Sequence, residues 1–149
     1  NAKKMKYFIR ILILFISISV TGCFGLFDSG SERIIGDYFL IWIDLPENQR
    51  IIKEFDNSGG GESVVPAYIY SVGHNEDFII AKQHPTSGFE SGYKINDKIT
   101  NYYIIDVKHK IIKSDKNIFV PLKKDAFDNM RKDLNIDTID FDMNYPDKY

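Results

Sequence analysis

Apolar residues are gathered in short runs between polar, glycine-containing segments, and the longest run predicts a β-strand over residues 34–45. β-Branched and aromatic side chains dominate this run, as is typical of strands. Alternation places Tyr38, Leu40 and Trp42 on one face and Phe39, Ile41 and Ile43 on the other. Because both faces are apolar, we expect a central strand that is covered on both sides.

The segments that follow predict a turn, a second ordered element and a loop. Residues 46–48 include a proline and an asparagine and predict a turn. Residues 49–55 fit a shorter strand, although their apolar spacing also fits a helix. Residues 56–63 are a loop by composition, since their three glycines lack the Gly-Lys-Ser/Thr ending of a phosphate-binding loop.

Residues 64–83 predict the clearest β-hairpin in the chain. Apolar and polar positions alternate over residues 67–72, and residues 73–77 supply a glycine-containing turn. The returning arm ends at His84, because Pro85 has no N–H to donate to a strand ladder. A largely polar connection over residues 86–97 follows.

The last third of the chain predicts two strands and then a helix. Strands are expected over residues 99–112 and 118–120. Residues 122–134 change to helical spacing, with a stripe of Phe127, Met130 and Leu134 and a candidate N-cap at Asp125. Residues 136–149 form an acidic C-terminal tail.

Together these elements predict a single α+β domain over residues 34–149. Five to six antiparallel strands would form one curved sheet or half-barrel, with one C-terminal helix against a face. A domain of this length can bury an adequate core without disulfides.

The N-terminal apolar run, residues 11–20, belongs to a different kind of segment. Lys3, Lys4, Lys6 and Arg10 precede it, and Thr21 and Gly22 follow it. A basic start, an apolar stretch and a small-residue exit are the three parts of a secretory signal. This run of ten residues, two of them serine, is too short to span a bilayer comfortably, since a spanning helix needs about 20 apolar residues.

The motif Val20-Thr21-Gly22-Cys23 resembles the lipobox of bacterial lipoproteins, an aliphatic residue and two small residues before a cysteine. This resemblance implies that the Cys23 thiol is joined to a diacylglycerol and that the chain is then cut before Cys23. We therefore expect a signal peptide at residues 1–22, a lipidated tether at residues 23–33 and a lipid on Cys23. The alternatives are an ordinary buried thiol, an uncleaved membrane anchor and ordinary secretion without a lipid.

The charge balance separates the N-terminal segment from the rest of the chain. The 149 residues carry 19 Lys and Arg against 21 Asp and Glu, a net charge of −2. Without its four basic N-terminal residues the chain has 15 basic residues against 21 acidic ones, a net −6. We expect no nucleic-acid partner, since such binders are usually strongly basic. A single cysteine also excludes a disulfide scaffold.

Candidate catalytic chemistry is sparse in this sequence. His74, His84 and His109 are expected in turns or at strand ends, facing solvent, and none has the spacing of paired metal ligands. No thiol remains after lipidation, and no Gly-x-Ser-x-Gly elbow is present. Asp140 and Asp142 share one side of the extended tail, where a solvated segment is favoured over a weak calcium contact. We therefore expect no catalytic, metal-binding or cofactor-binding residues and no cofactor.

Tyrosines show the one suggestive pattern. Tyr68 and Tyr70 share a strand face, and Tyr102 and Tyr103 lie on another strand. Tyrosine is favoured both in binding surfaces and in cores, because it is large, stiff and amphipathic. Core packing is the interpretation we favour here.

Four phrases of the sequence carry a further resemblance. They are Ile-Gly-Asp-Tyr (35–38), Tyr-Tyr-Ile-Ile-Asp (102–106), Val-Pro-Leu (120–122) and Phe-Asp-Asn-Met-Arg-Lys-Asp-Leu-Asn-Ile (127–136). Together they resemble a group of small uncharacterised bacterial lipoproteins classed as a domain of unknown function, over about residues 34–136. These motifs describe a fold, so the resemblance implies no catalytic residues.

The sequence thus predicts a lipid-anchored protein at the cell membrane or outer membrane, facing outside the cytoplasm. Its domain is expected to bind another envelope protein or a surface ligand without enzymatic activity. One alternative is an envelope hydrolase that uses dispersed Asp, Glu or His residues. Another is a purely structural spacer with no stable partner.

Overall fold

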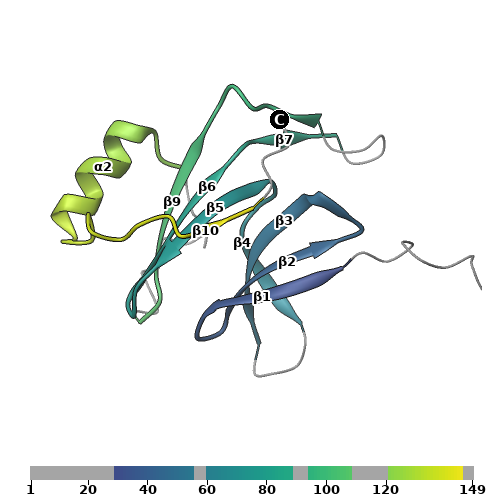
Figure 1. Ribbon diagram of the computed structural model, residues 1–149, viewed down its shortest axis with the longest axis horizontal. Helices are drawn as coiled ribbons and strands as arrows, with labels where there is room; N and C mark the ends of the chain where they lie inside the picture. The colour runs from purple at the N-terminus through teal and green to yellow at the C-terminus, as the bar shows by residue number, and fades with distance from the viewer. Residues whose placement is uncertain (1–28, 56–59, 89–93, 109–120, 146–149) are drawn as a thin grey trace, which may run out of the picture.

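The computed structural model describes residues 29–55, 60–88, 94–108 and 121–145. Within these ranges the first sheet, sheet A, is an antiparallel meander in which each strand pairs with the next along the chain (Figure 1). Its strands are β1 (Gly30–Ile35), β2 (Tyr38–Ile43), β3 (Leu45–Glu54) and β4 (Gly61–Val65). Short connections suit this order, because antiparallel neighbours need only a tight turn.

The second sheet, sheet B, combines segments from the middle and the end of the chain. Its spatial order is β10-β5-β6-β9, again antiparallel. The strands are β5 (Ile69–His74), β6 (Phe78–Gln83), β9 (Asn101–Asp106) and β10 (Met143–Asn144). A separate ribbon pairs β7 (Thr86–Ser87) with β8 (Lys94–Ile95).

The main core lies between the two sheets. Its buried members are Ile34, Tyr38, Leu40, Ile51 and Val65 from sheet A, and Ile69, Val72, Ile79, Ala81, Tyr103 and Ile105 from sheet B. These side chains recur at alternate strand positions, which is the period that puts one face of a sheet inward.

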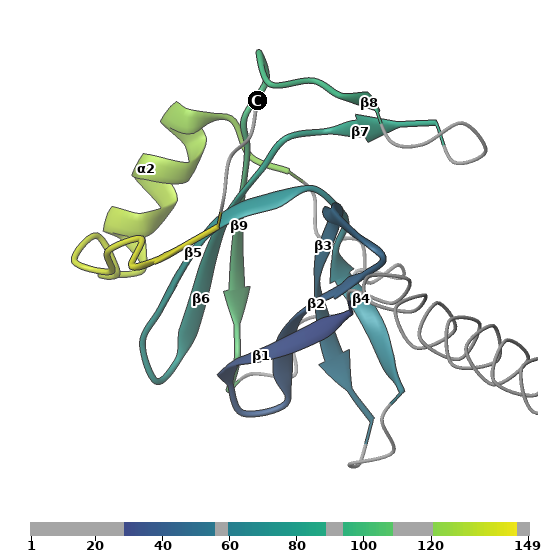
Figure 2. The same ribbon diagram turned by 45° about the vertical axis from the view of Figure 1, so that its right-hand side comes forward.

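Helix α2 (Lys124–Asp133) covers the opposite face of sheet B (Figure 2). Phe127 of this helix is buried with Ile80, Ile136 and Ile139 in a second apolar cluster. The neighbours of Ile80 on β6 belong to the main core, so β6 is buried on both faces. The described residues therefore form layers: sheet A, sheet B, and then α2 with the C-terminal segment.

The expected α+β class is confirmed in its coarse form. The described part of the chain holds antiparallel strands and one helix near its C-terminal end, and the sheets are not closed. The single curved sheet or half-barrel of five to six strands is matched only in part, because the strands divide between sheets A and B and a short ribbon. The division occurs at residues 66–68, where the chain leaves β4 and enters β5, so that each sheet buries a face against the other.

The single strand expected at residues 34–45 is wrong. Gly36 has a φ of +55°, a left-handed conformation that glycine adopts at little cost, and the chain reverses there between β1 and β2. The turn expected at residues 46–48 is also wrong, since these residues lie in β3 and the reversal occurs at Asp44, with a φ of 65°. Of the two interpretations of residues 49–55, the strand is confirmed.

The hairpin expected within residues 64–83 is confirmed as β5 and β6, while β4 pairs with β3 instead. The strand expected at 99–112 is present as β9, and residues 109–112 and 118–120 lie outside the described residues. The expected helix is confirmed as α2, but Met130 and Leu134 of its stripe are exposed. Asp125 is not the N-cap, because it lies in the first turn after Lys123.

The acidic C-terminal segment is integrated into the fold over the part that is described. Met143 pairs with Val72 across β10 and β5, and Tyr145 donates its N–H to the Tyr70 carbonyl. The Tyr145 hydroxyl donates to Glu32 Oε2 at 2.9 Å, which links this segment to β1 in the other sheet. Near the start of the described residues, residues 30–33, which were expected to belong to the tether, instead lie in β1.

Candidate functional site

His84, which directly follows β6, is the most enclosed histidine of the described residues. Only 5 % of it is exposed, and its ring stacks on Tyr70 with centroids 4.3 Å apart and planes 17° apart. His84 Nδ1 lies 2.8 Å from the Ile99 carbonyl oxygen. Since a carbonyl oxygen only accepts, Nδ1 carries the proton in this contact. The solvent-facing position expected for His84 is therefore wrong, because its ring is enclosed between tyrosine rings and bonds a backbone carbonyl.

A polar network extends from this stack across sheet B. Gln83 Nε2 donates to the Ala67 carbonyl at 2.6 Å, and Asn101 Nδ2 donates to Gln83 Oε1 at 2.8 Å. The Tyr70 hydroxyl lies 3.1 Å from Thr100 Oγ1. These bonds join the entry of β5 to β6 and to the start of β9. Buried polar groups that are satisfied in this way specify one packing arrangement of the strands.

The tyrosines follow the core-packing interpretation. Tyr68 and Tyr103 are almost fully buried, and Tyr102 lies against Phe127 with ring centroids 4.8 Å apart. Burial raises the pKa of the Tyr103 hydroxyl, because the charged phenolate is poorly solvated there. The described tyrosines thus hold β5 and β9 in place and do not gather on an open surface.

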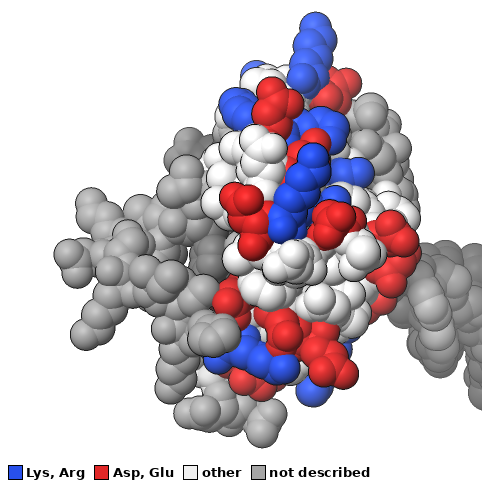
Figure 3. All heavy atoms as spheres, turned by 90° about the vertical axis from the view of Figure 1, so that its left-hand side faces the viewer, with Lys and Arg blue, Asp and Glu red and all other residues white. Residues whose placement is uncertain are grey.

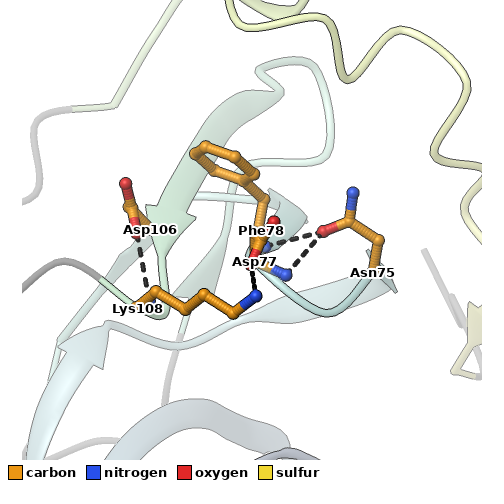
Figure 4. Close-up of polar contacts among 5 residues, drawn as sticks. All are labelled: Asn75, Asp77, Phe78, Asp106 and Lys108. Atoms are coloured by element: carbon orange, nitrogen blue, oxygen red, sulfur yellow. Dashed lines mark hydrogen bonds and ion pairs between the residues drawn. The ribbon is translucent and has the colours of Figure 1, made fainter.

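A second polar cluster lies at the opposite end of sheet B, at the β5–β6 turn (Figure 4). Asn75 Oδ1 accepts hydrogen bonds from the backbone N–H groups of Asp77, at 2.9 Å, and Phe78, at 2.8 Å. Lys108, beyond β9, forms an ion pair with Asp77, and its backbone N–H donates to Asp106 Oδ1 at 3.1 Å. The hydrogen bond to Asp77 raises the pKa of the Lys108 amine. Both side chains of the pair are about half exposed, so the pair fixes the turn and adds little stability.

The outward face of α2 carries charged side chains of both signs (Figure 3). Lys124 and Asp128 pair at 2.6 Å across one helical turn. Lys82, which lies over the Phe141 ring at 4.1 Å, has a lowered pKa because of burial and then because of its neighbours Lys124 and Arg131. This mixture of charges is typical of a solvated face.

Arg131, in the last turn of α2, has a structural role that the sequence analysis did not assign. Its guanidinium donates to the carbonyls of Ile136, at 3.3 Å, Asp137, at 2.7 Å, and Ile139, at 2.5 Å. It also lies over the Phe127 ring. These carbonyls belong to the segment after α2, so the position of Arg131 in the last helical turn did not by itself predict the contacts.

The other candidate residues that the structure describes are not gathered into a group of metal ligands. His74 lies at the end of β5, and its Nδ1 is buried without a hydrogen-bond partner. Asp140 and Asp142 are exposed on either side of Phe141. No group of three or more metal-ligating side chains occurs in the described ranges, and His109 lies outside them.

The expected lipid-attachment residue, Cys23, and its motif lie outside the described residues. Among residues 29–55, 60–88, 94–108 and 121–145, no helix has the length and apolar character needed to cross a membrane.

A family model described as "Protein of unknown function (DUF3997)" matches residues 35–145. The chain belongs to this family. The matched range runs from Ile35, the last residue of β1, to Tyr145, so it includes every described element except most of β1. Membership of a family of unknown function is confirmed, while the lipid anchor stays a prediction. No match was found among the curated proteins or among the solved structures.

Proposed function

We propose that this protein is a membrane-anchored extracytoplasmic lipoprotein whose DUF3997 domain is a non-enzymatic binding module. The observation that carries the proposal is the order of residues 3–23: basic side chains, ten apolar or small residues, then Val20-Thr21-Gly22-Cys23. The lipid on Cys23 would hold the domain at the cell membrane or outer membrane, facing outside the cytoplasm. Two acyl chains are enough for stable anchoring.

The position of the domain supports the same interpretation. The described residues begin at residue 29, and β1 begins at Gly30, seven residues after Cys23. Seven residues reach at most about 25 Å when extended. A lipid on Cys23 would therefore keep sheet A close to the membrane surface.

The binding role rests on how the described polar side chains are used. His84 is stacked and hydrogen-bonded, Asp77 is paired with Lys108, and Arg131 binds backbone carbonyls. Each of these side chains is engaged within the fold, as expected of a module that binds through its surface. The partner we propose is another envelope protein or a surface ligand.

Metabolic labelling tests the anchor. A labelled fatty acid added to bacteria that produce the chain is expected to enter the wild-type protein and to be lost from Cys23→Ala. Ser29→Ala, a conservative change outside the motif, serves as the matched control and is expected to label like wild type. Equal labelling of Cys23→Ala and wild type would show that the anchor is wrong.

The binding role has a separate test. Cross-linking of the full chain in intact cells is expected to trap one defined envelope partner in stoichiometric yield. Turnover of an envelope substrate by the purified protein would instead contradict the non-enzymatic role.

A further inference from the structure

The outward face of sheet A is apolar, and we propose that it docks onto the anionic phospholipid surface of the membrane that carries the anchor. This inference rests on the proposed lipid attachment at Cys23. The outer apolar face is defined by its side chains on β2 and β3: Phe39, Ile41, Ile43, Leu45 and Ile52.

Strand register places these side chains opposite to the core. On β2, Tyr38 and Leu40 are buried in the main core. Phe39 and Ile41 occupy the alternate positions, so they point to the other face. Ile52 on β3 is the register partner of Phe39, and Leu45 is the partner of Ile43. Ile43 is 50 % exposed and Leu45 is 48 % exposed, while the other three are partly buried.

Sheet A and sheet B differ in what covers their outward faces. On sheet B, α2 and the C-terminal segment bury Ile80 (Figure 1). No helix or strand of the described residues packs in this way on the outer apolar face. Antiparallel sheets with one solvated face normally alternate apolar and polar residues, whereas β2 is apolar on both faces. An apolar patch of this kind marks an interaction site.

Two arginines pair with residues of this face. Arg33 on β1 is the register partner of Phe39, and its guanidinium lies 4.9 Å from that ring. Arg50 on β3 is the register partner of Ile41. Apolar side chains flanked by arginine suit a lipid surface, because the apolar groups enter the acyl boundary while the guanidinium groups meet lipid phosphates. Two acidic residues also border the face: Asp44 lies between Ile43 and Leu45, and Glu54 ends β3 two positions after Ile52.

The tether favours a membrane over a soluble partner. β1 pairs directly with β2, so the strand next to the outer apolar face is the one that follows the tether. A lipid anchor within about 25 Å gives the bilayer a high effective concentration at this face. The α2 face lies on the side of sheet B that is turned away from sheet A, and it carries charges of both signs (Figure 3).

The test uses the full acylated chain in vesicles of phosphatidylglycerol or phosphatidylcholine, after mass spectrometry of the Cys23 acyl group. Because the sequence has a single cysteine, acylation leaves an introduced cysteine as the one free thiol. Ile43→Cys reports on the outer apolar face, and Met130→Cys on α2, 41 % exposed in the native protein, is the matched control. Each is labelled with an environment-sensitive fluorophore and exposed to brominated lipids, which quench from within the bilayer.

We expect brominated lipids to quench the Ile43→Cys label strongly in phosphatidylglycerol, weakly in phosphatidylcholine, and the Met130→Cys label weakly in both. Arg33→Gln should lower the ratio of docked to undocked protein about fivefold, the value of one arginine at an anionic surface. Arg33 is preferred to Arg50 for this variant, since Arg50 also bonds Asn48. Added salt should weaken docking in the same direction.

Three outcomes would overturn the inference. Equal quenching of the two labels in an acylated chain would contradict membrane docking by the outer apolar face and would leave the lipoprotein proposal intact. A label at Ile43→Cys that is shielded from aqueous acrylamide but not quenched by brominated lipid would show that a protein or a second copy covers the face. Absence of an acyl group on Cys23 would contradict both proposals together.

Discussion

Close backbone approaches decide which single residues this fold cannot change. At Gly73, on β5, an added Cβ would overlap the Asp140 carbonyl oxygen and lie 2.9 Å from the Asp140 carbonyl carbon. Gly36 is favoured for a different reason, its positive φ, and a Cβ there would meet only Val107 at 3.9 Å. One glycine thus provides space for a crossing chain, and the other provides a backbone conformation.

These two reasons make different predictions for substitution. Gly73→Ala should lower the free energy of unfolding by about 1–3 kcal/mol, because the Asp140 backbone cannot yield as a flexible side chain would. Gly36→Asn should cost little, since asparagine tolerates the left-handed region. Urea denaturation measures both. Equal losses at the two positions would show that space at Gly73 is not the limiting factor.

At the scale of elements, sheet B depends on α2 through one buried side chain. Phe127 is the buried residue of the helix, and it contacts the cluster around Ile80. Lys124 and Asp128 add a surface pair on the helix exterior. Packing of a single aromatic ring, supported by the Arg131 bonds to the following segment, therefore fixes the helix on the sheet.

Paired truncations on α2 test this dependence. Phe127→Ala should reduce the free energy of unfolding by about 3–5 kcal/mol, the usual cost of removing a buried phenylalanine ring. Met130→Ala, at an exposed position of the same helix, should change it by less than about 0.5 kcal/mol. Urea denaturation followed by circular dichroism measures both. A large loss for Met130→Ala would mean that the exposed side of α2 is also packed.

Local signals predicted the elements whose contacts are local. The β5–β6 hairpin was predicted correctly because its turn and both its arms lie within a few residues of one another. The division into two sheets was not predicted. β5 pairs at one edge with β10 and not with β4, and this pairing of Met143 with Val72 leaves no pattern in either segment alone. The burial of His84 was missed for the same reason, because its acceptor at Ile99 lies 15 residues away.

At the scale of the whole molecule, buried tyrosines link stability to pH. Burial raises the pKa of Tyr38, Tyr103 and Tyr145 above the ordinary value of 10.0, and Glu32 adds to the shift at Tyr145. As the pH rises, these hydroxyls therefore ionise at a lower pH in the unfolded chain than in the folded protein. Their contribution to stability is therefore complete below pH 10 and is lost as the pH climbs toward their folded values. Lys82 acts in the opposite direction, because its pKa is lowered in the folded state.

We expect the free energy of unfolding to fall as the pH is raised above about 10, since three tyrosines outweigh one lysine. Tyr145→Phe should make this fall shallower, and at neutral pH it should cost about 1 kcal/mol for the lost bond to Glu32. Urea titrations at pH 8, 10 and 11 measure both effects. Unchanged slopes for wild type and Tyr145→Phe above pH 10 would contradict the role of this hydroxyl.

The bond from Tyr145 to Glu32 spans 113 positions of the chain. Loops of that size close slowly, because much chain entropy is lost before any contact is gained. Sheet B also receives its last strand, β10, from this C-terminal segment. A growing chain can pair β1 with β2 and β5 with β6 early, but the final seam between the two sheets closes only after the whole domain has been synthesised. The link from sheet A to the C-terminal segment thus forms only after Tyr145, which follows every other described element of the fold, has been synthesised.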